Sequence, residues 1–140
     1  MSSMDAALKI LRLLQIALIS SIFLYILIGE MLGSKHPVTG ISAVVIAMLV
    51  MAALTVVIVV VLRKVVVGPA ATTLTSNADD ATALMRWRTG NIVLMALCES
   101  IALYGFVLRF LGYAFTQALP LYLAAIVLML YCGPKRPGAQ

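Results

Sequence analysis

The feature that most constrains this chain is a run of 22 residues, 41–62, that contains no charged side chain. A helix needs roughly 20 apolar residues to cross ~30 Å of hydrocarbon. The Val and Ile residues of this run would favour a buried strand in water, but the run is far longer than an ordinary strand. We therefore expect a membrane helix, which ends at the flanking charges Arg63 and Lys64.

Three further apolar runs have a similar length: residues 13–29, residues 90–108 with Glu99 as their single charge, and residues 112–132. The first run is too long for a secretory signal, and no small-residue cleavage site follows it. The sequence predicts an all-α integral membrane four-helix bundle that forms one domain over residues 1–140. The expected helices cover about residues 10–32, 41–67, 88–112 and 116–132.

The composition excludes several classes of protein. Hydrophobic residues make up 64% of the chain and charged residues 11%, and the mean hydropathy is +1.13. A soluble domain of 140 residues could not bury that much apolar surface, so a soluble enzyme and a disordered segment are both excluded. The net charge of +5 does not indicate nucleic-acid binding, because no basic stripe with interleaved aromatic residues accompanies it.

The positions of the basic residues predict the orientation in the membrane. Lys35 and Arg109 lie on one side of the predicted helices, and eight other Lys and Arg residues lie on the opposite side. Those eight are Lys9, Arg12, Arg63, Lys64, Arg86, Arg88, Lys135 and Arg136. Because cytoplasmic loops carry the excess of Lys and Arg, we expect both termini and the middle loop in the cytoplasm, with the protein in a bacterial-type inner membrane.

The middle segment, residues 68–88, is the most polar part of the chain, and we interpret it as a cytoplasmic loop. Gly68 and Pro69 are typical of a helix stop. Asp79 and Asp80 have the chemistry of a helix start, which would give a short helix leading into the third crossing and place Trp87 at the interface. A plain solvated linker is the alternative interpretation.

Two of the predicted helices resemble each other at an offset of 79 residues. Residues 20–25 (SSIFLY) align with residues 99–104 (ESIALY), and residues 32–33 align with residues 111–112. This pattern indicates a 2+2 internal duplication, or else a chance match of abundant residues. In a duplication, Ser20 takes the place that Glu99 has in the second half.

Glu99 is the most informative residue, because it lies nine residues from each end of the third run. An ionised carboxylate at that depth costs on the order of 2.5–3.5 kcal/mol. Such a group marks an ion or proton site, or it forms a hydrogen bond between helices. Tyr104 is a marginal neighbour on the same helix, so we expect polar partners from another helix or subunit. The candidates are Ser20, Ser21, Gln15 and Thr55.

A stripe of small residues on the same helix predicts close packing against a neighbour. The stripe comprises Cys98, Ala102, Gly105 and Gly112, together with Arg109, which we expect to extend to the outer interface. We interpret Cys98 and Cys132 as packing residues. His36 is the single histidine and cannot form a metal site alone, so we expect no metal and no cofactor.

The segment 97–107 (LCESIALYGFV) resembles the carboxylate helix of rotor-ring proteolipids, the c-subunit family of rotary ATPases. The resemblance covers eleven residues. In that family such a segment holds the carboxylate that binds H+ or Na+, so the resemblance implies this role for Glu99. The basic cytoplasmic loop of the family would correspond to residues 85–88.

The sequence thus predicts a small polytopic membrane protein that handles an ion or proton at Glu99. The candidate ion-binding residues are Glu99, Ser20, Ser21 and Tyr104. We expect it to work as a homo-oligomer or with other membrane subunits, with H+ or Na+ as its ion. The alternative is a non-transporting accessory or scaffold subunit. We do not expect an enzyme, because no nucleophile–base pair, metal-ligand spacing or phosphate-binding loop is present.

Overall fold

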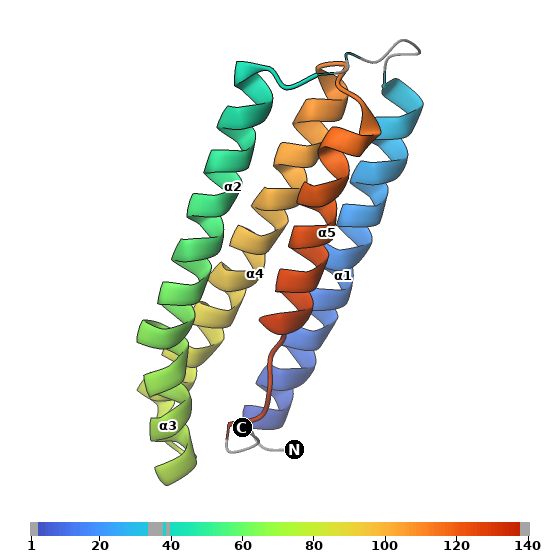
Figure 1. Cartoon of the computed structure of the whole chain (residues 1–140). Helices are drawn as coiled ribbons and strands as arrows, with labels where there is room; N and C mark the ends of the chain where they lie inside the picture. The colour runs from blue at the N-terminus through green and yellow to red at the C-terminus, as the bar shows by residue number, and fades with distance from the viewer. Residues whose placement is uncertain (1–2, 34–37, 39, 138–140) are drawn as a thin grey trace.

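The computed structural model describes residues 3–33, 38 and 40–137, and within them the chain is helical, with one isolated bridge between Val38 and Tyr113. Lys35, which we expect on the outer side, and His36, the single histidine, lie outside this described part. The helices form an elongated bundle (Figure 1). In chain order they are α1 (Ser3–Leu32), α2 (Ala43–Leu62), the π-helical turn η1 (Arg63–Val67), α3 (Gly68–Ser76), α4 (Ala81–Phe110) and α5 (Phe115–Tyr131).

The helices α2, η1 and α3 form one continuous rod of 34 residues, Ala43–Ser76. The predicted stop at Gly68 and Pro69 is therefore wrong. Pro69 has no N–H, and its ring would clash with the carbonyl four residues earlier in an α-helix. The π turn removes this conflict by widening the helix, so that the Gly68 N–H bonds to the Arg63 carbonyl, five residues back.

The segment expected as a loop over residues 68–88 is mostly helical. Only residues 77–80 connect α3 to α4. Asp80 caps α4, because its carboxylate accepts a hydrogen bond of 2.9 Å from the Ala83 N–H. The helix start expected at this aspartate is thus confirmed, and α4 begins seven residues before the predicted 88. Trp87 is 2% exposed, packed in the core of the bundle.

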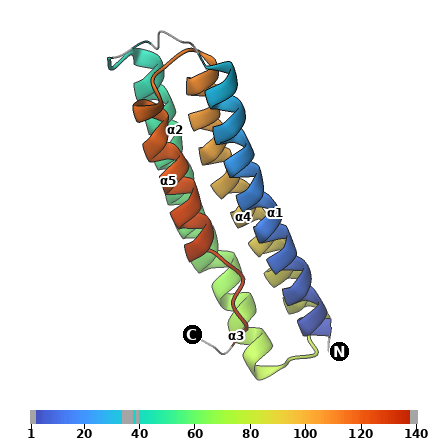
Figure 2. The same ribbon diagram turned by 90° about the vertical axis from the view of Figure 1, so that its right-hand side faces the viewer.

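The helix α4 is the centre of the bundle, since it contacts α1, α2, η1, α3 and α5. It runs parallel to α1, and the chain passes in the opposite direction along α2 and α5 (Figures 1 and 2). An ion pair of 3.5 Å between Arg136 and Asp5 joins the two described ends of the chain at one end of the bundle.

Three parts of the described chain are long and apolar enough to cross a membrane: α1, the rod from α2 to α3, and α4. These lengths indicate a membrane-embedded protein. The last helix, α5, has 17 residues, which corresponds to about 25 Å and is shorter than the hydrocarbon thickness.

The small-residue stripe of α4 packs against α5. Cys98 and Ala102 are fully buried, and a side chain at Gly105 would lie 3.2 Å from the Ala118 carbonyl oxygen. This part of the predicted stripe is where the two helices approach closely. Gly112 lies instead in the turn after α4, where its φ of 89° favours glycine. It was expected as a packing residue, but α4 ends at Phe110.

Candidate functional site: a carboxylate and a tyrosine between α1 and α4

The candidate site lies where α1 and α4 run side by side, in the C-terminal half of each helix. The Tyr25 hydroxyl of α1 donates a hydrogen bond of 2.8 Å to the Oε1 atom of Glu99 on α4. Glu99 is half-buried, whereas its neighbours Cys98 and Ile101 are fully buried. The carboxylate thus lies at the edge of the bundle and not in its core.

Aromatic packing fixes the position of the tyrosine. The ring of Tyr25 lies 5.8 Å from the ring of Phe106, centroid to centroid, and Phe106 lies 6.3 Å from Phe110. These distances are within the range of favourable aromatic pairs. Three rings from two helices therefore form a column that holds the Tyr25 hydroxyl against Glu99.

The two predicted serines have different environments. Ser21 is half-buried and lies one turn before Tyr25, on the same face of α1. Its role in the site stays a prediction. Ser20 is exposed, and its hydroxyl donates to the Ile16 carbonyl of its own helix at 2.9 Å. Within the described chain no hydrogen bond joins Ser20 to Glu99, and a role of Ser20 in ion binding stays a prediction.

The other candidate partners are engaged elsewhere. Thr55 donates to the Met51 carbonyl at 2.8 Å, and Gln15 donates to the Met129 carbonyl at 3.1 Å. Tyr104 is half-buried against the apolar core, and within the described chain no hydrogen bond joins it to Glu99. A five-residue spacing on one helix separates the two side chains by more than a third of a turn.

Sequence reasoning missed Tyr25, the residue that contacts Glu99. Side chains of a helix point back toward its N-terminus, so a long side chain covers the surface below its own Cα. The partner of Glu99 on α1 is therefore found about one turn after Ser20, toward the C-terminal end of the helix.

A second polar contact between the same helices lies near the opposite end from the chain termini. The Nε atom of Arg109 is 2.7 Å from the Oε1 atom of Glu30, and the two side chains are 6% and 47% exposed. Arg109 also donates to the Tyr113 carbonyl. The side chain of Arg109, which was expected to extend outward, is thus packed inward against Glu30 at this end of the bundle. Gly29 and Gly33 leave the space that its side chain fills.

No protein-family model, curated protein or solved structure matches the chain. The chemistry of the site therefore has to be argued from its geometry. No cluster of three or more His, Cys, Asp or Glu residues that could hold a metal ion occurs in the described residues. At Glu99, two side-chain oxygens meet, one from a carboxylate and one from a phenol. Hard metal cations take six or more oxygen ligands, whereas a proton needs one. The pair is suited to hold a proton.

Proposed function

We propose that the protein is a proton-handling subunit of a membrane assembly and that Glu99 is the group that takes up and releases the proton. The observation that carries this proposal is the 2.8 Å hydrogen bond from Tyr25 to a half-buried Glu99 in the middle of an apolar helix. Intramembrane carboxylates of this kind commonly belong to proton relays.

The surroundings of Glu99 are those of an intramembrane carboxyl group with one polar partner. An ionised carboxylate at mid-depth costs on the order of 2.5–3.5 kcal/mol unless a polar group is close. The phenol of Tyr25 is such a group, since it donates to the Oε1 atom of Glu99. A carboxyl group that exchanges a proton within a membrane needs a partner of this kind.

The half-buried position of Glu99 supports an assembly of several subunits. One oxygen is bonded to Tyr25, and the edge of the bundle beside it is free for a second copy of the chain or another membrane subunit to cover. The resemblance of residues 97–107 to the carboxylate helix of rotor-ring proteolipids is consistent with this role. Na+ is the alternative ion, which would require further oxygen ligands from such a neighbour.

We further propose that both termini face the cytoplasm of a cell with a bacterial-type inner membrane. The ion pair between Arg136 and Asp5 places the two described ends of the chain together. Basic residues gather at that end, where Arg63 and Lys64 follow α2 and Arg88 precedes the apolar part of α4. This distribution follows the positive-inside rule.

Carbodiimide labelling of the protein in liposomes tests the proposal, because carbodiimides react with protonated carboxyl groups in apolar surroundings. We expect mass spectrometry to find one label, on Glu99, whose yield falls as the pH rises. The variant Glu99→Gln removes the titratable group and should lose the label, and Glu30→Gln, the matched control, should keep it. Protection by Na+ at constant pH would identify Na+ as the ion. A yield that is independent of pH would refute proton exchange at Glu99.

The second candidate is a non-transporting accessory or scaffold subunit, and the same contact favours it. A hydrogen bond from Tyr25 to Glu99 joins α1 to α4 whatever else the carboxyl group does. Proton flux through liposomes that contain the protein and its partner subunits separates the two candidates. Flux that persists unchanged in Glu99→Gln would favour the scaffold, since glutamine keeps the hydrogen bonding and loses the proton exchange.

A further inference from the structure

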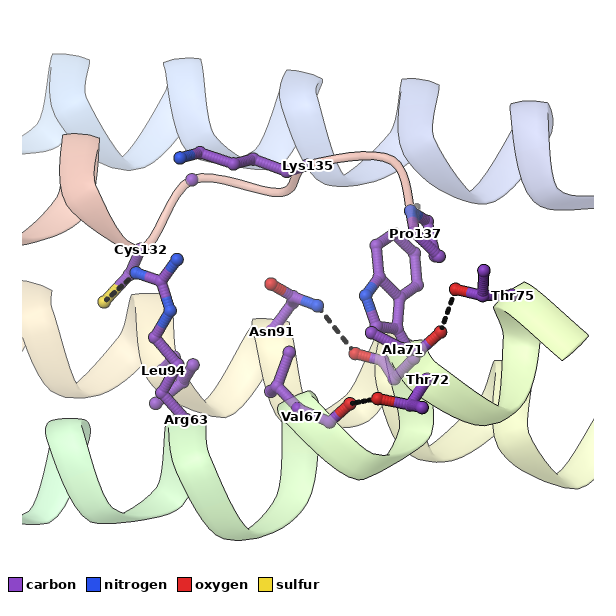
Figure 3. Close-up of a pocket in the computed structure, with 13 residues that line it drawn as sticks. Arg63, Val67, Ala71, Thr72, Thr75, Asn91, Leu94, Cys132, Lys135 and Pro137 are labelled. Carbon is purple, nitrogen blue, oxygen red and sulfur yellow. Dashed lines mark hydrogen bonds between the residues drawn. The ribbon is translucent and has the colours of Figure 1, made fainter. Parts of the chain in front are cut away.

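A cationic hollow lies at the end of the bundle where α2 and α5 finish. An open cavity of about 220 Å³ is lined by residues of η1, α3, α4 and the chain after α5 (Figure 3). A second hollow of about 460 Å³ adjoins it and shares Arg63 and Lys135 with it. Lys64 and Tyr131 line the second hollow as well. We call these two connected spaces the cationic hollow.

The charge of the hollow is one-sided. Arg63, Lys64 and Lys135 supply three positive charges, and neither lining contains an Asp or Glu among the described residues. Figure 3 shows Arg63 and Lys135 approaching from opposite sides, one from η1 and one from the chain after α5. Cations that converge without a carboxylate to neutralise them attract an anion.

The guanidinium of Arg63 is held in place before any ligand arrives. It stacks over the ring of Tyr131, 4.2 Å from the ring centroid. Its Nη1 atom donates to the Tyr131 carbonyl and lies 3.9 Å from the Cys132 sulfur. Arginine has five N–H donors, so most of them stay free for another acceptor. A planar, fixed guanidinium is the group that binds phosphate oxygens in pairs.

A buried polar side chain also faces the hollow. Asn91 is 3% exposed, and its amide nitrogen donates to the Trp87 carbonyl at 2.8 Å. Within the described chain no donor bonds to its carbonyl oxygen, which Figure 3 shows on the side of the cavity away from that bond. This oxygen is free to accept from a hydroxyl group, such as those of a glycerol headgroup.

The position of the hollow relative to the apolar helices indicates the source of the anion. Arg63 directly follows α2, and Tyr131 is the last residue of α5, so the cations lie at the level where lipid phosphates are found. Val60 and Tyr131 are 38% and 60% exposed and form an apolar wall beside the hollow. Acyl chains fit along such a wall, whereas a soluble anion gains nothing from it.

We propose that the cationic hollow binds the phosphodiester headgroup of an anionic phospholipid from the surrounding bilayer. Arg63 binds the phosphate oxygens, and Lys64 and Lys135 add charge at the rim. Asn91 accepts a hydrogen bond from a headgroup hydroxyl. This inference depends on membrane insertion and is independent of proton exchange at Glu99.

The fluorescence of Trp87, the single tryptophan of the chain, provides the readout because this residue lines the cavity. The purified protein in neutral detergent is titrated with dioctanoyl phosphatidylglycerol, dioctanoyl phosphatidylcholine and inorganic phosphate. We expect saturable binding of phosphatidylglycerol that weakens with added salt, and no saturable signal from the other two. Saturation by phosphatidylcholine, or competition by inorganic phosphate at equal concentration, would overturn the lipid assignment.

Matched variants locate the site. Lys64 and Lys135 are both exposed, so Lys64→Gln with Lys135→Gln should fold normally and weaken phosphatidylglycerol binding about tenfold. The control pair, Lys9→Gln with Arg88→Gln, removes the same charge elsewhere and should leave binding unchanged. Arg63→Lys keeps the charge and loses the planar fork, and should also weaken binding. An equal loss in the control pair would show general electrostatic attraction in place of a defined site.

Discussion

At the scale of single residues, α1 supplies a partner for both charged groups of the apolar part of α4. Glu99 accepts from Tyr25, and Arg109 pairs with Glu30. Charged side chains within apolar helices are costly unless a polar group is close. The two contacts therefore fix the rotation and the offset of α1 against α4. Apolar packing alone would leave both of these loosely defined.

A double-mutant cycle measures the first contact. We expect Tyr25→Phe, Glu99→Ala, which removes the acceptor, and their combination to show a coupling free energy of about 0.6 kcal/mol and at most about 1.7 kcal/mol, the range for hydrogen bonds between membrane helices. Unfolding in mixed micelles gives the free energies. Ser20→Ala is the control and should show no coupling to Glu99. Strict additivity of Tyr25→Phe and Glu99→Ala would argue against the contact.

The pair at Arg109 should contribute more, because this side chain is only 6% exposed. Arg109→Gln leaves the Tyr113 carbonyl without its donor and the Glu30 carboxylate without its counter-charge. We expect the free energy of unfolding to fall by about 2–4 kcal/mol. Arg88→Gln, at an exposed position, should change it by less than about 0.5 kcal/mol. Similar losses in both variants would mean that Arg109 is not a structural ion pair.

At the scale of elements, the π turn between α2 and α3 determines how far the second rod extends. It accommodates Pro69 within a continuous helix, and a π turn corresponds to one extra residue in an α-helix. The rod thereby reaches beyond Arg63 and packs α3 against α4, which encloses one side of the cationic hollow.

Deletion of single residues tests this view of the rod. In a Pro69→Ala background, which removes the clash of the proline ring with an α-helical carbonyl, removing Val65 from the π turn should convert it to an ordinary α-helical turn while both flanking helices keep their faces, with a change in stability within about 1 kcal/mol. Removing Val57 from the middle of α2 rotates one part of the helix by about 100° against α4, and should destabilise the protein far more. Both residues are exposed. Equal destabilisation by the two deletions would contradict the extra-residue interpretation.

The sequence predicted the elements of the bundle better than their ends. The apolar runs place α1, α2, α4 and α5 because a helix that crosses a membrane needs an uncharged stretch of set length. Gly68 and Pro69 misled the prediction of the α2 end, since a π turn has no clear signal in the sequence. Tyr25 was not predicted as the partner of Glu99, because the faces on which two helices meet depend on how the helices pack. The sequence alone does not show this packing.

At the scale of the whole molecule, the described ends of the chain and the turn between α3 and α4 lie at one end of the bundle (Figure 1). The bridge between Val38 and Tyr113 lies at the other end. The α1 and α4 helices have 30 residues each and run in parallel, as a duplication would require, whereas α2 has 20 residues and α5 has 17.

Cysteine labelling tests the proposed orientation. In a background of Cys98→Ala and Cys132→Ala, we introduce Asn77→Cys between α3 and α4 or Leu111→Cys after α4, both at exposed positions. An impermeant maleimide added to intact spheroplasts should label Leu111→Cys alone, and detergent permeabilisation should add Asn77→Cys. The opposite pattern would reverse the orientation and place the cationic hollow in the outer leaflet.

The shortness of α5 has a consequence for the route to Glu99. The α5 helix is about 5 Å shorter than the hydrocarbon layer of a typical bilayer, and Cys132 and Asn91 lie together beside a cavity at its C-terminal end. A bilayer that spans α1 and α4 would have to thin around such a short helix. Asn91 and Glu99 are eight residues apart on α4, or about 12 Å, whereas Gly112 at the far end is thirteen residues away, or about 20 Å. Under the proposed function, a proton that leaves Glu99 would therefore have its shorter path to water on the side of Asn91.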